Sequence, residues 1–353
     1  MIRATVFVSR HFTAFACLAY LIAWGERLAE MILHTGPLWQ LRSNSLTQYF
    51  VSYPDHGFAK RALLGTVFRP LLQAVEQPEL WAFWMMVGMN VLGFAGAIWL
   101  ARKVLPHDET GNLPTILRAA FAVGSVGVVQ IAHDYGRFDL PNYFILAGAL
   151  WLVLQGRAWA AGAACAAGIL IHEAFAVYAA PLAVALAWQS NPPERRAAAA
   201  AQVALAAGIA TLAVLLYGSS SSAAMLQIGT GAYVWQRGLI EIGWDLPWYQ
   251  VAVLAGYWAI LLALLVRTSH AREPRFDPIW MAALSPLALN LLGIDHGRWV
   301  TIGFVILTAS LVLQVRQSGG RWPELSTRQL RVAGLLALPL GPHGVTGAWT
   351  WIF

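Results

Sequence analysis

Residues 158–188 read AWAAGAACAAGILIHEAFAVYAAPLAVALAW, an apolar stretch interrupted by one histidine–acid pair, His172-Glu173. A helix that crosses the hydrocarbon layer of a membrane needs about 20 apolar residues, and a charged side chain inside that layer is costly. The stretch is therefore either one long span or two short spans, 158–171 and 174–188, joined by a tight turn.

Basic residues on either side of this stretch decide between the two interpretations. Arg157 precedes it, and Arg195 and Arg196 follow it. Cytoplasmic loops of membrane proteins are enriched in arginine and lysine. Two spans place all three arginines on the same side of the membrane, whereas one span separates them. The sequence therefore predicts two spans.

The rest of the chain has the same character. Of its 353 residues, 58% are hydrophobic and only 11% are charged, whereas soluble domains carry about 25% charged residues. We predict an all-α, polytopic helical membrane protein with about eleven transmembrane helices, forming a single domain over residues 1–353. The expected spans are 8–28, 80–101, 114–132, 140–155, 158–171, 174–188, 197–217, 250–266, 278–293, 299–315 and 331–348.

Charge sets the expected orientation. With the N-terminus in the cytoplasm, most of the 23 lysines and arginines fall in cytoplasmic segments. The net charge of +6 is then a property of these loops and does not indicate nucleic-acid binding. We expect a bacterial inner membrane protein with its C-terminus on the periplasmic side.

This orientation leaves two long segments outside, 29–79 and 218–250. In the first, Phe58–Leu80 alternates apolar and basic residues in a way that is typical of an amphipathic helix lying in the membrane interface. The second contains tryptophans that are suited to anchoring at the interface.

Four histidine–acid pairs stand at the ends of apolar stretches, and all four fall on the outer side. They are Asp55-His56, His133-Asp134, His172-Glu173 and Asp295-His296. Three of them have basic residues within five positions: Lys60 and Arg61, Arg137 (with Asp139 beside it), and Arg298. The common side predicts one polar, outward-facing site, with Asp55, His56 and Glu30 as catalytic candidates and the remaining residues as substrate ligands.

For each group, the sequence leaves more than one interpretation open. Asp55 is either a reactive carboxylate or the N-cap of the interfacial helix. Lys60 and Arg61 would bind a phosphate or lipid headgroups. Arg137 and Arg298 either close local ion pairs or bind phosphate in a bidentate manner.

His172-Glu173 could simply be a turn held by side-chain hydrogen bonds. A divalent metal is conceivable because histidine and carboxylates are suitable ligands, but the sequence has no zinc-type HExxH spacing and no cysteine cluster. No cofactor is therefore predicted. The sequence also has no P-loop, no dinucleotide fingerprint and no GxSxG motif.

In layout the chain resembles the GT-C class of membrane glycosyltransferases. The resemblance rests on the cytoplasmic N-terminus, the eleven spans, and the first outer loop with an acid ahead of an interfacial helix. It implies a polyprenyl-phosphate-linked sugar donor, a glycan or lipid acceptor, and surrounding membrane lipids as partners. The catalytic carboxylate of this class lies in the first outer loop, which implies Asp55, or Glu30 if the site lies nearer the first span. Many members have two adjacent acids there, whereas this chain has Asp55-His56.

The resemblance implies that Asp55 is a general base on an acceptor hydroxyl and that arginines stabilise the departing lipid phosphate. Two alternatives stay open. One is a lipid-linked glycan polymerase or ligase. The other is a proton-coupled transporter or flippase, whose ionisable residues would lie nearer the midplane of the membrane.

Overall fold

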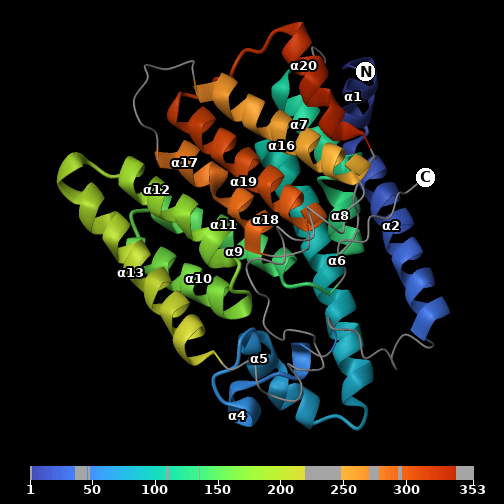
Figure 1. The fold of residues 1–353 in the computed structure, drawn as a ribbon, viewed down its shortest axis with the longest axis vertical. Coiled ribbons are helices and arrows are strands. Elements are labelled where there is room, and N and C mark those ends of the chain that lie inside the picture. The colour runs from blue at the N-terminus through green and yellow to red at the C-terminus, as the bar shows by residue number, and fades with distance from the viewer. Residues whose placement is uncertain are drawn as a thin grey trace. The chain divides into compact units, whose positions relative to one another are not determined.

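The fold is given by a computed structural model, which describes residues 2–35, 46, 48–108, 111–134, 136–218, 248–269, 278–292 and 296–338. The elements of these residues are α-helices and short 3-10 helices, as predicted (Figure 1). Two compact units are each assembled from separate pieces of the chain. Unit 1 comprises Met1–Arg27, Phe94–Asp134 and Val234–Phe353, and unit 2 comprises Leu28–Gly93 and Tyr135–Tyr233.

The helices of the described residues have the following bounds. In order they are α1 (Ile2–Arg10), α2 (Phe12–Thr35), η2 (Gln48–Phe50), α4 (Tyr53–His56), α5 (Ala62–Gln73), α6 (Pro78–Val104), α7 (Leu113–Val123), α8 (Val128–His133), α9 (Asp139–Leu154), α10 (Ala158–Ile171), α11 (Phe175–Tyr178), α12 (Ala180–Ser190), α13 (Pro193–Tyr217), α16 (Trp248–Ser269), α17 (Pro278–Leu284), η4 (Ser285–Ala288), α18 (Leu289–Leu292), α19 (His296–Gln317), α20 (Thr327–Ala333) and η5 (Gly334–Ala337).

Several of these helices have the length and composition of membrane spans. Within the described residues, five are long and apolar enough: Pro78–Val104, Leu113–His133, Pro193–Tyr217, Val251–Thr268 and His296–Gln317. Ile2–Arg10 and Phe12–Glu26 pass the same test together as a sixth, although they are bent by 92°. Four shorter apolar segments match further expected spans: Asp139–Leu154, Ala158–Ile171, Phe175–Ser190 and Pro278–Ala288. The total of eleven stays a prediction, because most of the last expected span lies outside the described residues.

The break within residues 158–188 is present where it was predicted. Helix α10 ends at Ile171 and α11 begins at Phe175. His172 has an extended backbone, with φ −153° and ψ 116°, and its ring Nδ1 accepts a hydrogen bond from the Ala174 backbone N–H at 3.2 Å. The stretch is therefore two helical segments, and a side-chain hydrogen bond holds the turn between them.

Small residues bring the helices of unit 2 close together. Helix α10 packs along α13 and α9, and α12 also packs along α13 (Figure 1). At Gly162 of α10 an added Cβ would lie 2.9 Å from the Cβ of Ala206 and 3.0 Å from the carbonyl oxygen of Gln202. Such close backbone approach is how helices associate in membranes, where the hydrophobic effect between them is absent.

Gly162→Leu is expected to destabilise unit 2 by about 1–3 kcal/mol, because the added side chain overpacks the α10–α13 contact. Gly208 of α13 is the matched control, since a Cβ there meets nothing within 4 Å. Thermal unfolding in detergent should show a lower midpoint for Gly162→Leu and an unchanged one for Gly208→Leu. Equal midpoints for the two variants would contradict the packing.

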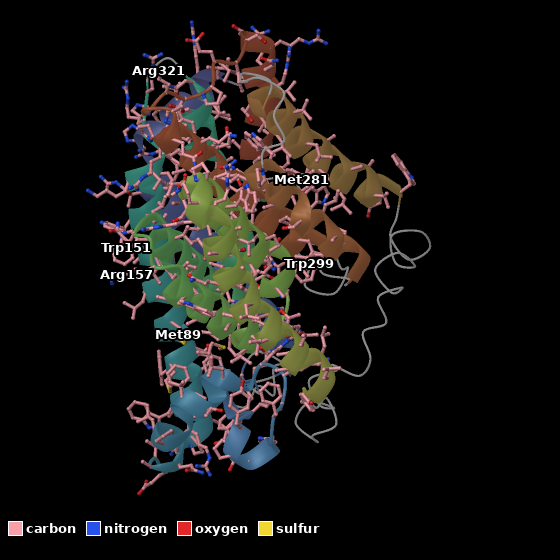
Figure 2. The ribbon with its side chains drawn as sticks, turned by 90° about the vertical axis from the view of Figure 1, so that its left-hand side faces the viewer. Met89, Trp151, Arg157, Met281, Trp299 and Arg321 are labelled. Carbon is pink, nitrogen blue, oxygen red and sulfur yellow. The ribbon has the colours of Figure 1, made fainter. Side chains whose placement is uncertain are left out.

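Exposed aromatic side chains mark one end of the short helices of unit 2. Trp151 near the end of α9 is 54% exposed, and Trp159 at the start of α10 is 56% exposed. Figure 2 shows Trp151 and the nearby Arg157 at the surface of the molecule. Exposed tryptophan beside arginine is typical of a membrane interface.

Unit 1 has α19 in its interior, and most of this helix from His296 to Gln314 is buried. Helix α16 crosses it closely: a Cβ at Gly303 would come 2.6 Å from the Trp258 ring. Helix α7 is buried along almost its whole length. These helices form an apolar core in which several polar side chains are also buried.

The segment expected to form the interfacial helix differs in detail from the prediction. Helix α5 begins at Ala62, four residues later than the expected start at Phe58, and ends at Gln73. Its N-cap position is occupied by Arg61 rather than Asp55, so the interpretation of Asp55 as the N-cap is wrong. The late start follows from Gly57 and Arg61, whose positive φ angles of 67° and 62° are incompatible with a continuous helix.

Candidate functional site

The predicted site residues are divided between the two units. Asp55-His56, His172-Glu173, Arg137 and Asp139 belong to unit 2. His133-Asp134, His296 and Arg298 belong to unit 1. Two candidates cannot be placed, because Asp295 and the side chain of Glu30 lie outside the described residues. A single site containing all four pairs stays a prediction.

Asp55 is held by an arginine that the sequence did not suggest. Arg69 of α5 donates from Nε to Oδ2 and from Nη2 to Oδ1 of Asp55, both at 2.8 Å. The Ser52 hydroxyl donates a further hydrogen bond to Oδ2. Because Arg69 follows Asp55 by 14 residues, on the next helix, the pairing depends on how α4 folds back on α5.

Local sequence explains this return of the chain. Ser52 precedes the four-residue helix α4, and Pro54 stands in its first turn. Gly57 then takes a positive φ angle and reverses the chain. Helix α5 approaches η2 and the residue after it at Gly65, where a Cβ would come within 3.0 Å of the Tyr49 and Val51 carbonyl oxygens. Glycine at position 65 is therefore required to bring Arg69 to Asp55.

These contacts control the ionisation of Asp55. The hydrogen bonds from Arg69, then that from Ser52, lower the pKa of Asp55 from its usual value to about 2. The hydrogen bonds to Asp55 in turn raise the pKa of Arg69. Asp55 is therefore a carboxylate at any physiological pH.

A pH dependence of stability follows from this shift. Because the pKa of Asp55 is lower in the folded protein, its stabilisation is complete above the unfolded value near 4 and is lost as pH falls through about 2. The difference in unfolding midpoint between wild type and Asp55→Asn is expected to shrink as pH falls from 4 towards 2. A difference that stays constant over this range would contradict the ion pair.

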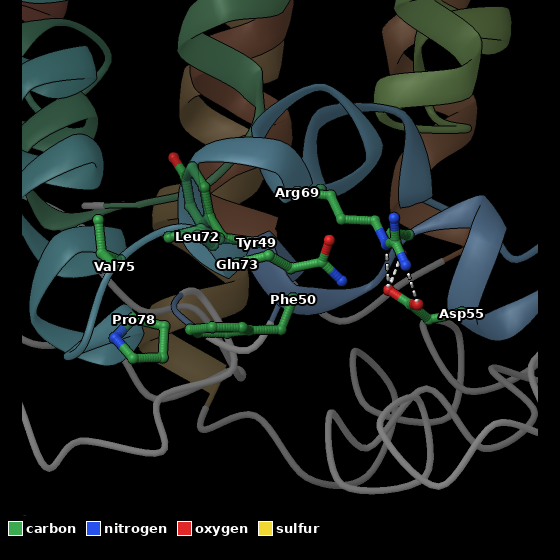
Figure 3. Close-up of a pocket in the computed structure, with 10 residues that line it drawn as sticks. Tyr49, Phe50, Asp55, Arg69, Leu72, Gln73, Val75 and Pro78 are labelled. Carbon is green, nitrogen blue, oxygen red and sulfur yellow. Dashed lines mark hydrogen bonds and ion pairs between the residues drawn. The ribbon is translucent and has the colours of Figure 1, made fainter.

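Asp55 and Arg69 line a cavity of about 410 Å³ that lies wholly within unit 2. Its other lining residues are Tyr49, Phe50, Ser52, Gly65, Leu72, Gln73, Val75 and Pro78. Figure 3 shows the ion pair at one end and Val75 and Pro78 at the other, with Gln73 and Phe50 between them. The cavity therefore combines a charged end, a central amide and aromatic ring, and an apolar end.

A second arginine–carboxylate pair joins the N-cap residue of α5 to the α10–α11 turn. Arg61 donates from Nη2 to Oε1 of Glu173 at 2.6 Å and from Nε to Oε2 at 2.9 Å. The Arg61 side chain is only 13% exposed, and that of Glu173 is 35% exposed. Arg61 was expected to bind phosphate or headgroups, but in this structure its guanidinium binds Glu173.

His56 and Lys60 are next to members of these two pairs in the sequence, whereas Asp139 belongs to α9. The His56 ring Nδ1 is 3.3 Å from the Ser52 backbone nitrogen. The stem of Lys60 lies beside the end of α13, where a Cβ on Gly218 would be 3.1 Å from Lys60 Cγ. Asp139 is buried at the start of α9.

In unit 1, a buried polar group surrounds the end of α8. Gln130 donates to Oδ2 of Asp134 at 2.9 Å. His133 is 3% exposed, and its Nε2 lies 4.0 Å from a carboxylate oxygen of Glu26 on α2. Glu26 lies four residues before Glu30 on α2, and its carboxylate is directed toward His133.

A second buried polar group of unit 1 lies at the start of α19. The His296 ring Nδ1 is 3.3 Å from the side-chain oxygen of Asn290. Arg298 is 2% exposed, and its guanidinium lies 4.5 Å from the centre of the Trp299 ring. Buried charge of this kind in a membrane protein usually has a functional role.

The described residues contain no group of three or more histidine, cysteine, aspartate or glutamate side chains arranged to hold a metal ion. Comparisons of the chain with protein-family models, curated proteins and solved structures gave no match.

Proposed function

We propose that this protein transfers a sugar from a polyprenyl-phosphate-linked donor to a glycan or lipid acceptor at the outer face of the membrane, as glycosyltransferases of the GT-C class do. The observation that carries this proposal is the ionised Asp55 at the charged end of the cavity, paired with Arg69. A carboxylate beside a phosphate-binding side chain is what such a transfer requires.

The reaction would use these groups in a defined way. The acceptor hydroxyl oxygen forms a bond to the anomeric carbon of the sugar while the bond from that carbon to the phosphate oxygen breaks. The hydroxyl proton moves to Asp55, and the lipid phosphate leaves with the electron pair. An arginine at the leaving oxygen stabilises its growing negative charge.

The lining of the cavity supports a substrate that has a polar sugar at one end and an apolar lipid at the other. The Gln73 amide can bind sugar hydroxyls, and the Phe50 ring offers a face for a sugar to stack on. Leu72, Val75 and Pro78 provide an apolar end suited to the first isoprene units of a lipid.

The finer topology belongs to the same proposal. The protein would cross a bacterial inner membrane with about eleven helices, with its N-terminus in the cytoplasm and α5 in the outer interface. Support comes from the five or six candidate spans and from the exposed Trp151 and Trp159 next to Arg157.

The test is transfer by the purified full-length protein in proteoliposomes. Polyprenyl phosphates carrying different sugars are supplied with a lipid extract as acceptor, and sugar incorporation is measured. Incorporation above that of empty liposomes supports the proposal. Its absence with every donor, while the protein remains folded, would refute the transferase function.

Proton-coupled transport is a second candidate, because His133, Asp134, His296 and Arg298 are at least nine-tenths buried among the helices of unit 1. In proteoliposomes that contain a pH indicator, transport predicts a proton flux on addition of polyprenyl-phosphate sugar. His133→Gln should abolish that flux. A sealed vesicle that shows transfer and no flux would exclude this candidate.

A further inference from the structure

Arg69 and Asp55 satisfy each other in this structure. Both oxygens of the carboxylate accept N–H groups from the Nε and Nη2 edge of one guanidinium. A general base must direct a lone pair at the hydroxyl from which it takes a proton. The lone pairs that point at Arg69 are not available for this purpose, and the charge of the guanidinium makes the carboxylate a weaker base, so opening of the pair makes Asp55 a better acceptor for the proton.

The edge of Arg69 that binds Asp55 is also the edge that suits a phosphate. The guanidinium fork binds carboxylates and phosphates with the same bidentate geometry. The phosphate of a polyprenyl-phosphate-linked sugar is a diester with one negative charge, equal to that of the carboxylate, and the sugar-free polyprenyl phosphate is a monoester with up to two, so both can compete with Asp55. Arg69 is 32% exposed and Asp55 41% exposed, and both line the cavity, so a ligand there can reach the pair.

We propose that a phosphate group entering this cavity replaces Asp55 on Arg69, so that a single binding event anchors the phosphate and releases the carboxylate. This inference rests on the proposed transfer function, in which the phosphate is that of the lipid donor. Asp55 would then become a stronger base when a donor is present.

The second arginine pair is different in the features that matter for exchange. The Arg61 side chain is only 13% exposed. Its backbone stands at a positive φ angle of 62°, and its side chain connects the outer segment to the α10–α11 turn by a contact across 112 residues. Arg61–Glu173 therefore serves as a structural connection and provides a matched control.

Competition for one guanidinium has a measurable consequence. If Asp55 and phosphate exclude each other on Arg69, removing the carboxylate charge must tighten phosphate binding. The gain must disappear when Arg69 is also replaced, because a simple loss of negative charge nearby would act without Arg69. A double-mutant cycle separates these two cases.

The experiment uses full-length protein in phosphatidylcholine nanodiscs, titrated with polyprenyl phosphate that carries no sugar and, separately, with inorganic phosphate. Asp55→Asn is expected to lower the Kd for polyprenyl phosphate by about fivefold, and Arg69→Gln to raise it by about tenfold or more. In the Arg69→Gln background, Asp55→Asn should leave the Kd unchanged. Glu173→Gln should also leave it unchanged.

The outcomes divide clearly. Tighter binding of the lipid phosphate by Asp55→Asn, dependent on Arg69, supports the exchange, whether or not inorganic phosphate shows the same gain. A gain confined to inorganic phosphate would overturn the assignment of the ligand to a lipid. An unchanged or weaker Kd, in a variant that is folded at the temperature of the titration, would overturn the exchange itself.

The binding measurement does not need sugar transfer, so the two proposals fail separately. Exchange without transfer by the wild type would refute only the transferase function. Transfer by the wild type without a gain in Asp55→Asn would refute only the exchange.

Discussion

Asp55→Asn is expected to lower the kcat of sugar transfer by about a hundredfold or more. The amide has the size of the carboxylate but cannot accept the proton of the acceptor hydroxyl, and general-base catalysis contributes about 10²–10⁴-fold. The KM for the donor should not rise, because the amide is a weaker competitor for Arg69. Initial rates at varied donor concentration, measured in proteoliposomes, give both parameters.

A suitable control for this variant is Glu324→Gln. Glu324 is an exposed acid in the segment that precedes α20 in unit 1, outside the cavity lining. It should retain the wild-type rate. A wild-type kcat in Asp55→Asn would eliminate Asp55 as the base and would direct attention to Glu30.

Arg61→Ala is expected to destabilise the protein by about 1–3 kcal/mol. Removal of one partner of a buried ion pair leaves the other charge uncompensated, at a cost of about 3–5 kcal/mol when both are fully buried. The lower figure applies here because the Glu173 side chain is 35% exposed and water screens part of its charge. Thermal unfolding in detergent measures the change.

Arg61→Gly separates the ion pair from the backbone. Position 61 has a φ angle of 62°, which glycine adopts freely and alanine does not. Both variants lose the contact with Glu173, but the glycine variant should be more stable than the alanine variant by about 1 kcal/mol. A glycine variant that is no better than the alanine variant would show that the backbone at this position is unstrained.

Hydropathy and breaker residues located most helices well. The span expected at 197–217 is contained in α13, Pro193–Tyr217, and the span expected at 80–101 is contained in α6, Pro78–Val104. The break at His172-Glu173 was also predicted correctly. It was inferred from the histidine–acid pair itself and from the arginines that flank the same stretch of chain. These features depend on residues that are neighbours in the chain.

The partners of the site residues were found much less well. The sequence placed Lys60 and Arg61 within five residues of the Asp55-His56 pair and predicted that they bind a phosphate or lipid headgroups. The structure instead pairs Asp55 with Arg69 and Arg61 with Glu173. The only available signal for Arg69 was its place among the basic residues of an amphipathic helix, which gives no direction toward a particular acid.

The sequence by itself determined that this is a helical, apolar chain with an acidic residue ahead of helix α5, because hydropathy and charge depend on composition over short windows. Only the tertiary structure decided which arginine neutralises which acid and that Asp55 lines a cavity. Those contacts depend on where Gly57 reverses the chain and where Gly65 allows close backbone approach. Ion pairs between helices are set by the path of the backbone through space, and that path is not written in the spacing of charges along the chain.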